Sequence, residues 1–267
     1  MNNVLYGFRF TPVLILNTLA AVQLSSFNSG QRLHPTLESM AVRIRKRRSE
    51  LPDLSPFVVD PDLEAIWGKI DGEDLFIRNE LHSCRGFRKL HLELAVMGTG
   101  LQILHCVFFP EPTFDLPIFG VDLVAGPGGI SAAIVDLSPV RAELPESVLD
   151  SLGTLSIPFF SQSRELPSWG SIFSPYVRFV RPVSSEEEEC FLDLVDGYLE
   201  ILIASLPLIV PDQPDSRFTI ERYQGQTSYC LQQKRNDKTR SVLAKAFDSH
   251  WADRYLGEVL FDMPPSF

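Results

Sequence analysis

The sequence predicts an α/β protein in which one antiparallel β-sheet lies between helices. Two observations carry this prediction. Three pairs of strand-like segments are each joined by a turn that contains glycine, which is typical of consecutive β-hairpins. Segments with helical periodicity precede and follow these pairs, so helices are available to cover the sheet. We therefore expect a three-layer α/β/α sandwich and a single domain over residues 33–267.

The strand segments are indicated by their β-branched and aromatic residues and by the turns between them. The predicted pairs are residues 65–70 with 75–81 around Asp71-Gly72, residues 88–97 with 101–109 around Gly98-Thr99-Gly100, and residues 118–125 with 130–137 around residues 126–129. Residues 176–183 form a further predicted strand.

Three helical regions complete the predicted architecture. Residues 35–50 have apolar positions and a basic C-terminal end, which suits the negative end of the helix dipole. Ser185 and Glu188 fit a capping box, so we expect a second helix to begin there. Its apolar positions share one face: Phe191, Leu194, Val195, Tyr198 and Leu202. The third region lies after Pro214, around residues 241–259.

The chain is acidic, with 24 Lys and Arg residues, 34 Asp and Glu residues and a formal net charge of −10. General nucleic-acid binding relies on a basic face, so this composition argues against that class of protein. Basic residues are nevertheless gathered in three runs, at residues 43–48, 85–89 and 234–240. A single run is usually a solvated surface, but it can also attract an acidic partner.

The cysteines and the N-terminus bear on the compartment. Cys84, Cys106, Cys190 and Cys230 are widely spaced, which predicts free thiols in a reducing cytoplasm rather than disulfides, zinc or an iron–sulfur cluster. Residues 11–24 are largely apolar, but they are too few to span a bilayer comfortably and make a poor secretory signal. We expect residues 1–32 to be a poorly ordered extension, with export or a misassigned start codon as alternatives.

Ionisable side chains occur within three of the predicted strands. His91 and Glu93 lie two residues apart and therefore on one face of a strand, while His105 and Asp122 lie in apolar surroundings on two others. If these strands are neighbours, one face presents four groups able to hold or deliver protons near neutral pH. Each residue alone is more often a hydrogen-bonded structural residue. A metal site is another alternative, but no tight ligand spacing supports it.

Other motifs do not support a bound cofactor. The glycines at residues 126–129 lack the dinucleotide-binding fingerprint and the lysine of a phosphate-binding loop, so a hairpin turn explains them better. The sequence has no Gly-x-Ser-x-Gly nucleophile elbow. The residues by themselves predict a sheet with a proton-active face and no cofactor or metal of its own.

Four longer stretches are more specific: FRKLHLELAVMGTGLQILHCVFFPEP, LPIFGVDLVAGPGGISAAIVDLSPV, RELPSWG and QQKRNDKTRSVLAKAF. In order and spacing, from about Leu33 to about Asp262, the chain resembles the ferredoxin-dependent bilin reductases. The resemblance implies an α/β/α sandwich with biliverdin between the sheet and the C-terminal helices. It also implies that ferredoxin supplies single electrons, and that the protein supplies protons and binds no cofactor.

The resemblance also implies roles for individual residues. Asp122 corresponds to the central aspartate that contacts the pyrrole nitrogens or lactam oxygen and relays protons, and His105 to the histidine beside it. Glu93 corresponds to the glutamate near the D-ring vinyl group, and His91 to its neighbouring histidine. The implied substrate-binding residues are Arg164 and Lys238 for the propionates and Asn236 as a polar neighbour.

Within the family that the chain resembles, the presence of both Glu93 and His105 favours a four-electron reduction of biliverdin IXα to phycocyanobilin, and the resemblance implies that the D-ring vinyl group is reduced before the A-ring. The alternatives are a reductase that makes phycoerythrobilin or dihydrobiliverdin, and a bilin-binding chaperone or lyase without reductase activity. Because ferredoxins are acidic, a local basic patch would steer their docking. The candidate docking residues are Arg85, Arg88, Lys89, Lys234 and Arg235. We expect a monomer that binds neither nucleic acid nor membrane.

Overall fold

The computed structural model describes residues 32–167 and 170–266. The expectations for residues 1–31, including the apolar stretch 11–24, lie outside these residues. From His34 onward the chain forms one compact unit. Within the described residues, no helix combines the length and the apolar character that crossing a membrane requires.

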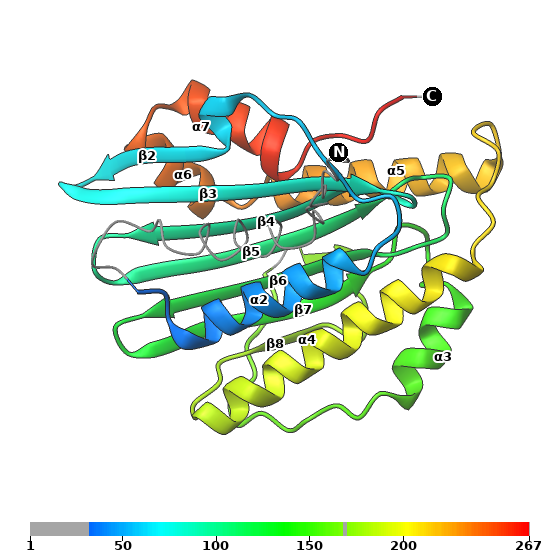
Figure 1. The fold of residues 1–267 in the computed structure, drawn as a ribbon, viewed down its shortest axis with the longest axis horizontal. Helices are drawn as coiled ribbons and strands as arrows, with labels where there is room; N and C mark the ends of the chain where they lie inside the picture. Colours follow the sequence, from blue (N-terminus) through cyan, green and yellow to red (C-terminus); the bar gives the residue numbers. More distant parts are fainter. Residues whose placement is uncertain (1–31, 168–169, 267) are drawn as a thin grey trace, which may run out of the picture. The chain divides into compact units, whose positions relative to one another are not determined.

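An antiparallel sheet runs through this unit (Figure 1). Its eight strands in the described residues are β1 (Ser55–Pro56), β2 (Ala65–Ile70), β3 (Glu73–Cys84), β4 (Phe87–Met97), β5 (Leu101–Pro110), β6 (Ile118–Gly126), β7 (Gly129–Ser138) and β8 (Arg178–Val180). Their order is β1-β3-β4-β5-β6-β7-β8, with β2 paired to the other end of β3. Since consecutive strands from β2 to β7 pair in sequence order, the predicted antiparallel meander is confirmed.

The three predicted hairpins are present, and their turns show why the chain reverses at these positions. Asp71 and Gly72 both have positive φ angles, 51° and 89°, as a tight two-residue hairpin turn requires. Gly129, with a φ of 96°, begins β7 directly after the turn of the third predicted hairpin, and a residue with a Cβ atom would be strained there. In these hairpins, the residues of the turn therefore fix the two joined strands as neighbours.

Strand β8 is shorter than the predicted strand at residues 176–183. It covers Arg178–Val180 and pairs with β7. Pro175 and Pro182 lie on either side of it, and proline has no N–H to donate to a strand ladder. The prolines therefore limit the strand that the apolar residues favour.

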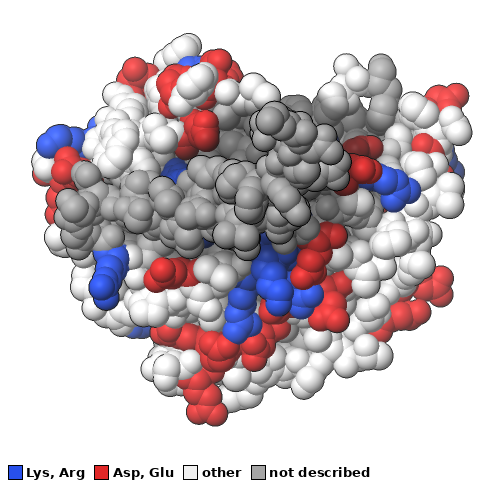
Figure 2. Space-filling view, viewed as in Figure 1, with Lys and Arg blue, Asp and Glu red and all other residues white. Residues whose placement is uncertain are grey.

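Helices α2 (Pro35–Ser49) and α4 (Ser185–Ser205) pack on one face of the sheet, and α3 (Glu146–Thr154) packs against α4. Ion pairs join the basic run of α2 to acidic residues of α4 and β3: Arg43 to Asp193, Arg47 to Asp196, and Arg48 to Glu80. Basic and acidic side chains accordingly lie side by side on this side of the molecule (Figure 2). The first basic run thus connects structural elements.

Helix α4 begins one residue before the predicted position. The Ser184 side chain accepts a hydrogen bond from the backbone N–H of Glu187, so these two residues, rather than Ser185 and Glu188, form the capping pair. Two consecutive serines make both positions chemically suitable, and the extended backbone at Ser184 selects the first. The predicted apolar face is correct, because all five of its residues are buried: Phe191, Leu194, Val195, Tyr198 and Leu202.

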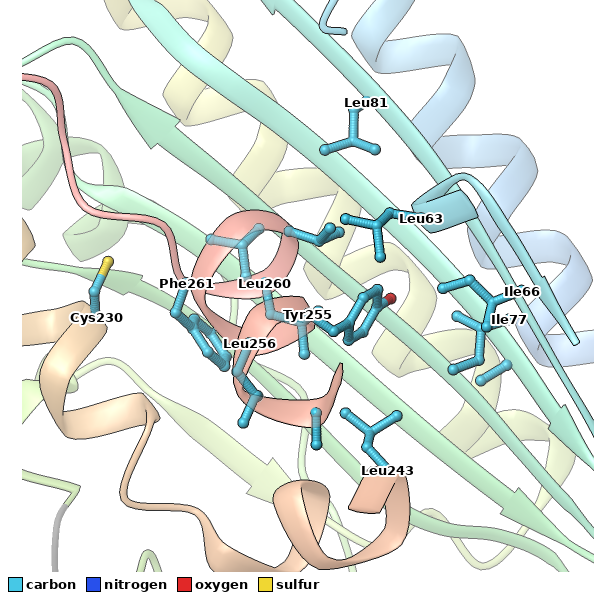
Figure 3. Packing of buried hydrophobic residues seen from close by; sticks show 14 of the residues in the cluster. Leu63, Ile66, Ile77, Leu81, Cys230, Leu243, Tyr255, Leu256, Leu260 and Phe261 are labelled. Carbon is cyan, nitrogen blue, oxygen red and sulfur yellow. The ribbon is translucent and has the colours of Figure 1, made fainter. Parts of the chain in front are cut away.

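The C-terminal helices pack on the opposite face. They are α5 (Arg217–Gln233), α6 (Asp237–Ala246) and α7 (Ser249–Tyr255), followed by a π-helical turn at Leu256–Leu260. Their apolar side chains pack over the strands in a hydrophobic core cluster (Figure 3). Two neighbouring residues of β3 show that these helices lie on opposite faces of the sheet. Asn79 accepts a hydrogen bond from Tyr255 of α7, whereas Glu80 accepts one from Arg48 of α2. The predicted helical region 241–259 covers α7 and part of α6, whereas the sequence did not predict α3 or α5.

Helix α5 lies close to the segment that follows β7 because a glycine of the helix faces it. A Cβ atom at Gly225 would lie 2.0 Å from the backbone oxygen of Val140, so a larger residue requires a shift of the backbone. One turn further along, Tyr229 lies over Gly120 of β6, where a Cβ atom would be 3.5 Å from the tyrosine hydroxyl. α5 therefore lies above the face of β6 that also carries Asp122.

Candidate active site

Four polar side chains line up across neighbouring strands. Asn79 of β3 lies opposite Glu93 of β4, Glu93 lies opposite His105 of β5, and His105 lies opposite Asp122 of β6. Residues directly opposite one another share a face of the sheet, so these four form one line, here called the polar row. The structure thus brings Glu93, His105 and Asp122 together, as strand alternation predicts, and it adds Asn79.

Exposure increases along the polar row toward β6. Asn79 is 2% exposed and Glu93 is 8% exposed, whereas the Asp122 side chain is 43% exposed. Beyond Asp122, the same face continues with Ile134 of β7 and Phe179 of β8, both half-buried. The part of this face formed by Asp122, Ile134 and Phe179 is here called the floor. It is open and largely apolar, it contains one accessible carboxylate, and buried acid–base groups lie at one side of it.

His105 and Asp122 form an acid–base pair at the edge of the floor. His105 Nδ1 lies 2.6 Å from Asp122 Oδ1. Burial disfavours the charged imidazole, but the charge of Asp122 and this hydrogen bond outweigh burial and raise the pKa of His105. Its Nε2 is buried and has no hydrogen-bond partner among the described residues. The pair is therefore suited to holding a proton and passing it to a group on the floor.

Glu93 lies deeper in the polar row, where its surroundings favour the protonated form. Burial raises the pKa of its carboxyl group, and the His105 charge and a hydrogen bond with the Tyr255 hydroxyl offset this only in part. The Tyr255 oxygen lies 2.6 Å from Glu93 Oε2. A carboxyl group in this environment can keep its proton near neutral pH and give it to a stronger base.

His91 lies beside Glu93 on the same face of β4 and is completely buried. Burial lowers its pKa well below the usual range, and the charges of Lys89 and His105 lower it further. Its Nε2 lies 2.8 Å from Asn79 Oδ1, and the two histidine rings lie 5.8 Å apart. His91 is therefore a neutral, fixed neighbour of the acid–base groups rather than a second proton store.

The structure places Arg164 beside the open floor. Its backbone N–H donates to the carbonyl of Phe179 at 2.8 Å, which fixes this residue next to β8. Its guanidinium lies 5.2 Å from the centre of the Phe179 ring, and the residue is exposed. A cation in this position can reach an anionic group at the margin of a flat ligand.

Lys238 and Asn236 lie at the start of α6, where Asn236 is the N-cap residue and Lys238 is exposed. Among the described residues, no hydrogen bond or ion pair shown joins either residue to the polar row. Their assignment to the substrate therefore stays a prediction, as does that of Arg164.

Two of the five candidate docking residues are wrong. Lys89 is 0% exposed, and its Nζ contacts Asp262 and the carbonyl oxygen of Val259, so a partner protein cannot reach it. The Arg88 side chain is 8% exposed and is also paired with Asp262. Their partner lies more than 170 residues away in the sequence, so the basic run gave no sign of burial. The other three are at least partly exposed: Arg85, Lys234 and Arg235.

Metal ligands are not grouped in the described part of the chain, where no set of three or more His, Cys, Asp or Glu residues could hold an ion. The four cysteines, Cys84, Cys106, Cys190 and Cys230, are free. Burial raises the pKa of the Cys106 thiol well above its ordinary value, and burial also raises that of Cys84 to about 11. These two thiols are therefore protonated and unreactive at neutral pH.

The comparison with known proteins identifies the family. The model of the ferredoxin-dependent bilin reductases matches residues 41–262. The chain belongs to this family. A relative of this bilin reductase, the phycocyanobilin:ferredoxin oxidoreductase of Prochlorococcus marinus strain MIT 9313, is 61% identical over 255 residues, which are 96% of each chain. That of Synechococcus sp. strain CC9902 is 55% identical over 245 residues, which are 92% of this chain and 100% of the relative.

Solved structures show the same fold. The tomato phytochromobilin synthase, determined in complex with biliverdin, superposes on this bilin reductase with a TM-score of 0.65. The superposition covers 84% of this chain and 82% of the tomato chain, at 18% sequence identity. The sheet with helices is therefore shared by proteins whose sequences have diverged widely.

Proposed function

We propose that the protein reduces biliverdin IXα to phycocyanobilin with electrons from reduced ferredoxin. The observation that carries this proposal is the polar row, which places acid–base groups of different depth along one open floor. The chain is 61% identical to a protein named phycocyanobilin:ferredoxin oxidoreductase, which supports the same product. Four electrons and four protons are added to the bilin, in two steps of two electrons and two protons each: the D-ring vinyl group first, then the A-ring.

Biliverdin binds on the open floor, between the sheet and the C-terminal helices. Its flat, conjugated system suits half-buried apolar side chains such as Ile134 and Phe179, while Asp122 meets its polar pyrrole edge. Arg164 binds a propionate at the β8 side of the floor through its guanidinium. Lys238 and Asn236 complete the propionate and polar contacts from α6, a role that rests on the resemblance of their sequence motif.

The polar row supplies protons because electron transfer alone makes the tetrapyrrole more basic. His105 and Asp122 protonate the pyrrole and lactam edge, since their shared hydrogen bond keeps a proton next to the floor. Glu93 protonates the D-ring vinyl group, since burial raises the pKa of its carboxyl group and so favours the acid form. His91 stays neutral and fixes the neighbouring side chains.

Ferredoxin docks through the basic residues Arg85 and Arg235, which are exposed, and Lys234, which is partly exposed. On a chain with a net charge of −10, local basic residues are needed to attract an acidic carrier. Charge reversal at Arg85 and Arg235 should raise the KM for ferredoxin and weaken its dependence on salt. The matched control is Lys46→Glu, at an exposed basic position on α2, which should leave both unchanged.

The protein works as a cytoplasmic monomer without a redox cofactor of its own. Free cysteines are typical of a reducing compartment. Bound substrate and a docked carrier already require much of the surface, which supports the monomeric state. Metal analysis and the absorbance of the purified protein test whether it carries a bound cofactor. Mass measurement in solution tests the oligomeric state.

The test of the function is anaerobic turnover with biliverdin and a ferredoxin-reducing system, followed by absorbance and by chromatography of the product. We expect phycocyanobilin, formed through a semi-reduced intermediate. Phycoerythrobilin or dihydrobiliverdin would make the protein a reductase of different regiochemistry. Tight binding without reduction, beside a working control enzyme, would show a pigment carrier and refute the proposal.

A further inference from the structure

The orientation of the Asn79 side chain is fixed by its surroundings. Its Nδ2 donates to the carbonyl oxygen of Leu63 at 2.6 Å, so the amide oxygen must point the other way. This Oδ1 lies 2.8 Å from His91 Nε2 and 2.9 Å from the Tyr255 hydroxyl oxygen. A carbonyl oxygen only accepts hydrogen bonds, so Asn79 is a fixed acceptor between two donors.

The Tyr255 hydroxyl has two partners but only one proton. Its oxygen lies 2.9 Å from Asn79 Oδ1 and 2.6 Å from Glu93 Oε2. When Glu93 is an acid, it donates its own proton to the Tyr255 oxygen, and Tyr255 donates to Asn79. When Glu93 is a carboxylate, the tyrosine proton must turn toward Glu93. The tyrosine therefore satisfies both states of the acid by rotation of one O–H bond.

We propose that Tyr255 and Asn79 are positioning residues for Glu93, in which the tyrosine hydroxyl switches its donor bond each time Glu93 gains or loses a proton. This inference rests on the proposed function, where Glu93 delivers protons to the bilin. The switch matters because a buried carboxylate with no donor is strongly disfavoured, and proton release would then be slowed. Tyr255 itself keeps its proton, since burial and the Glu93 charge raise its pKa well above the ordinary value.

Tyr255→Phe tests the switch because it removes the hydroxyl alone. The phenylalanine ring can keep the stacking on Trp251, where the ring centres are 5.1 Å apart. The matched control is Tyr198→Phe. Tyr198 is equally buried, but its hydroxyl donates to the carbonyl of Tyr176, on the α4 side of the sheet, at 2.6 Å. Both variants lose one buried hydroxyl, and only one of them loses contact with Glu93.

The first readout is infrared spectroscopy of the protein without bilin. The carbonyl stretch of the Glu93 acid is assigned by difference against Glu93→Gln, which separates it from Asp136, another buried carboxyl group with a raised pKa. We expect Tyr255→Phe to move this band to higher frequency, because the acid loses its acceptor, and Tyr198→Phe to leave it in place. A band that stays in place in Tyr255→Phe would overturn the proposal.

The second readout is the rate of the two reduction steps. Tyr255→Phe should slow the D-ring step about ten- to hundredfold, as expected for the loss of a hydrogen bond to a charged group, and leave biliverdin binding unchanged. Tyr198→Phe should slow neither step. A D-ring rate equal to that of the control would also overturn the proposal. If the wild-type protein does not reduce biliverdin, the proposed function fails, whereas the infrared readout still reports on the Tyr255–Glu93 contact.

Discussion

Lys89 allows a quantitative prediction because it is an ionisable group with no access to solvent. Burial lowers its pKa from the ordinary 10.5 to about 8, although the charge and hydrogen bond of Asp262 partly oppose this. Arg88 and Cys230 are the other titratable groups that act on it. The charged ammonium group therefore lowers the free energy of unfolding. Replacement by methionine removes both this destabilisation and the titrating proton.

The sign and size of the effect follow from linkage. Below pH 8 the lysine is charged in both the folded and the unfolded chain, so the full cost is present. Between pH 8 and 10.5 the folded chain loses its proton first, and the free energy of unfolding rises. The pKa difference corresponds to about 3 kcal/mol. Between pH 8 and 10.5, the free energy of unfolding of the wild-type protein should therefore rise by up to that amount relative to Lys89→Met.

Urea unfolding at a series of pH values measures this gain as the difference between the two proteins. Lys69→Met is the matched control, because the Lys69 side chain is 71% exposed and its removal should leave the pH dependence parallel to the wild type. Lys89→Met should also leave the salt dependence of the ferredoxin KM unchanged, since no partner reaches this position. Parallel stability curves for the wild type and Lys89→Met would refute the reasoning.

Three further substitutions test the floor and helix α5 above it. Asp122→Asn should bind biliverdin almost as tightly but fail to complete the reduction, and a wild-type product yield would contradict its role. Arg164→Ala should raise the Kd for biliverdin about tenfold with little change in kcat; an unchanged Kd would remove the residue from the site. Gly225→Ala should destabilise the protein by about 1–3 kcal/mol, because its Cβ would meet the backbone of Val140. An unchanged urea midpoint would show that α5 moves away freely.

The sequence predicted the site where local rules decide the structure. Glycine-containing turns define the hairpins, the turn at residues 98–100 makes β4 and β5 neighbours, and alternation sets the face of each side chain. These rules place Glu93 beside His105, whereas Asp122 joins them because β6 pairs with β5, a pairing that no predicted hairpin required. The same rules predicted the sheet, but they did not give the exact start of α4, where two serines are equivalent in sequence.

The parts that the sequence did not reveal depend on contacts between distant segments. Asn79 is an ordinary polar residue in a strand until Tyr255 is brought over it, and the tyrosine is separated from Glu93 by 162 residues. Lys89 looks like part of an exposed basic run because its partner Asp262 lies near the other end of the chain. Neither turn chemistry nor periodicity contains this information, since it arises when α7 and the C-terminal segment pack on the sheet.

The central claim is that the buried end of the polar row protonates the D-ring vinyl group, and product analysis of Glu93→Gln tests it most directly. Glutamine keeps the size of the side chain and its capacity for hydrogen bonds but has no acidic proton to release. We predict that this variant binds biliverdin and, in anaerobic turnover with reduced ferredoxin, leaves the D-ring vinyl group intact in every product separated by chromatography. Phycocyanobilin at the wild-type yield would contradict the account.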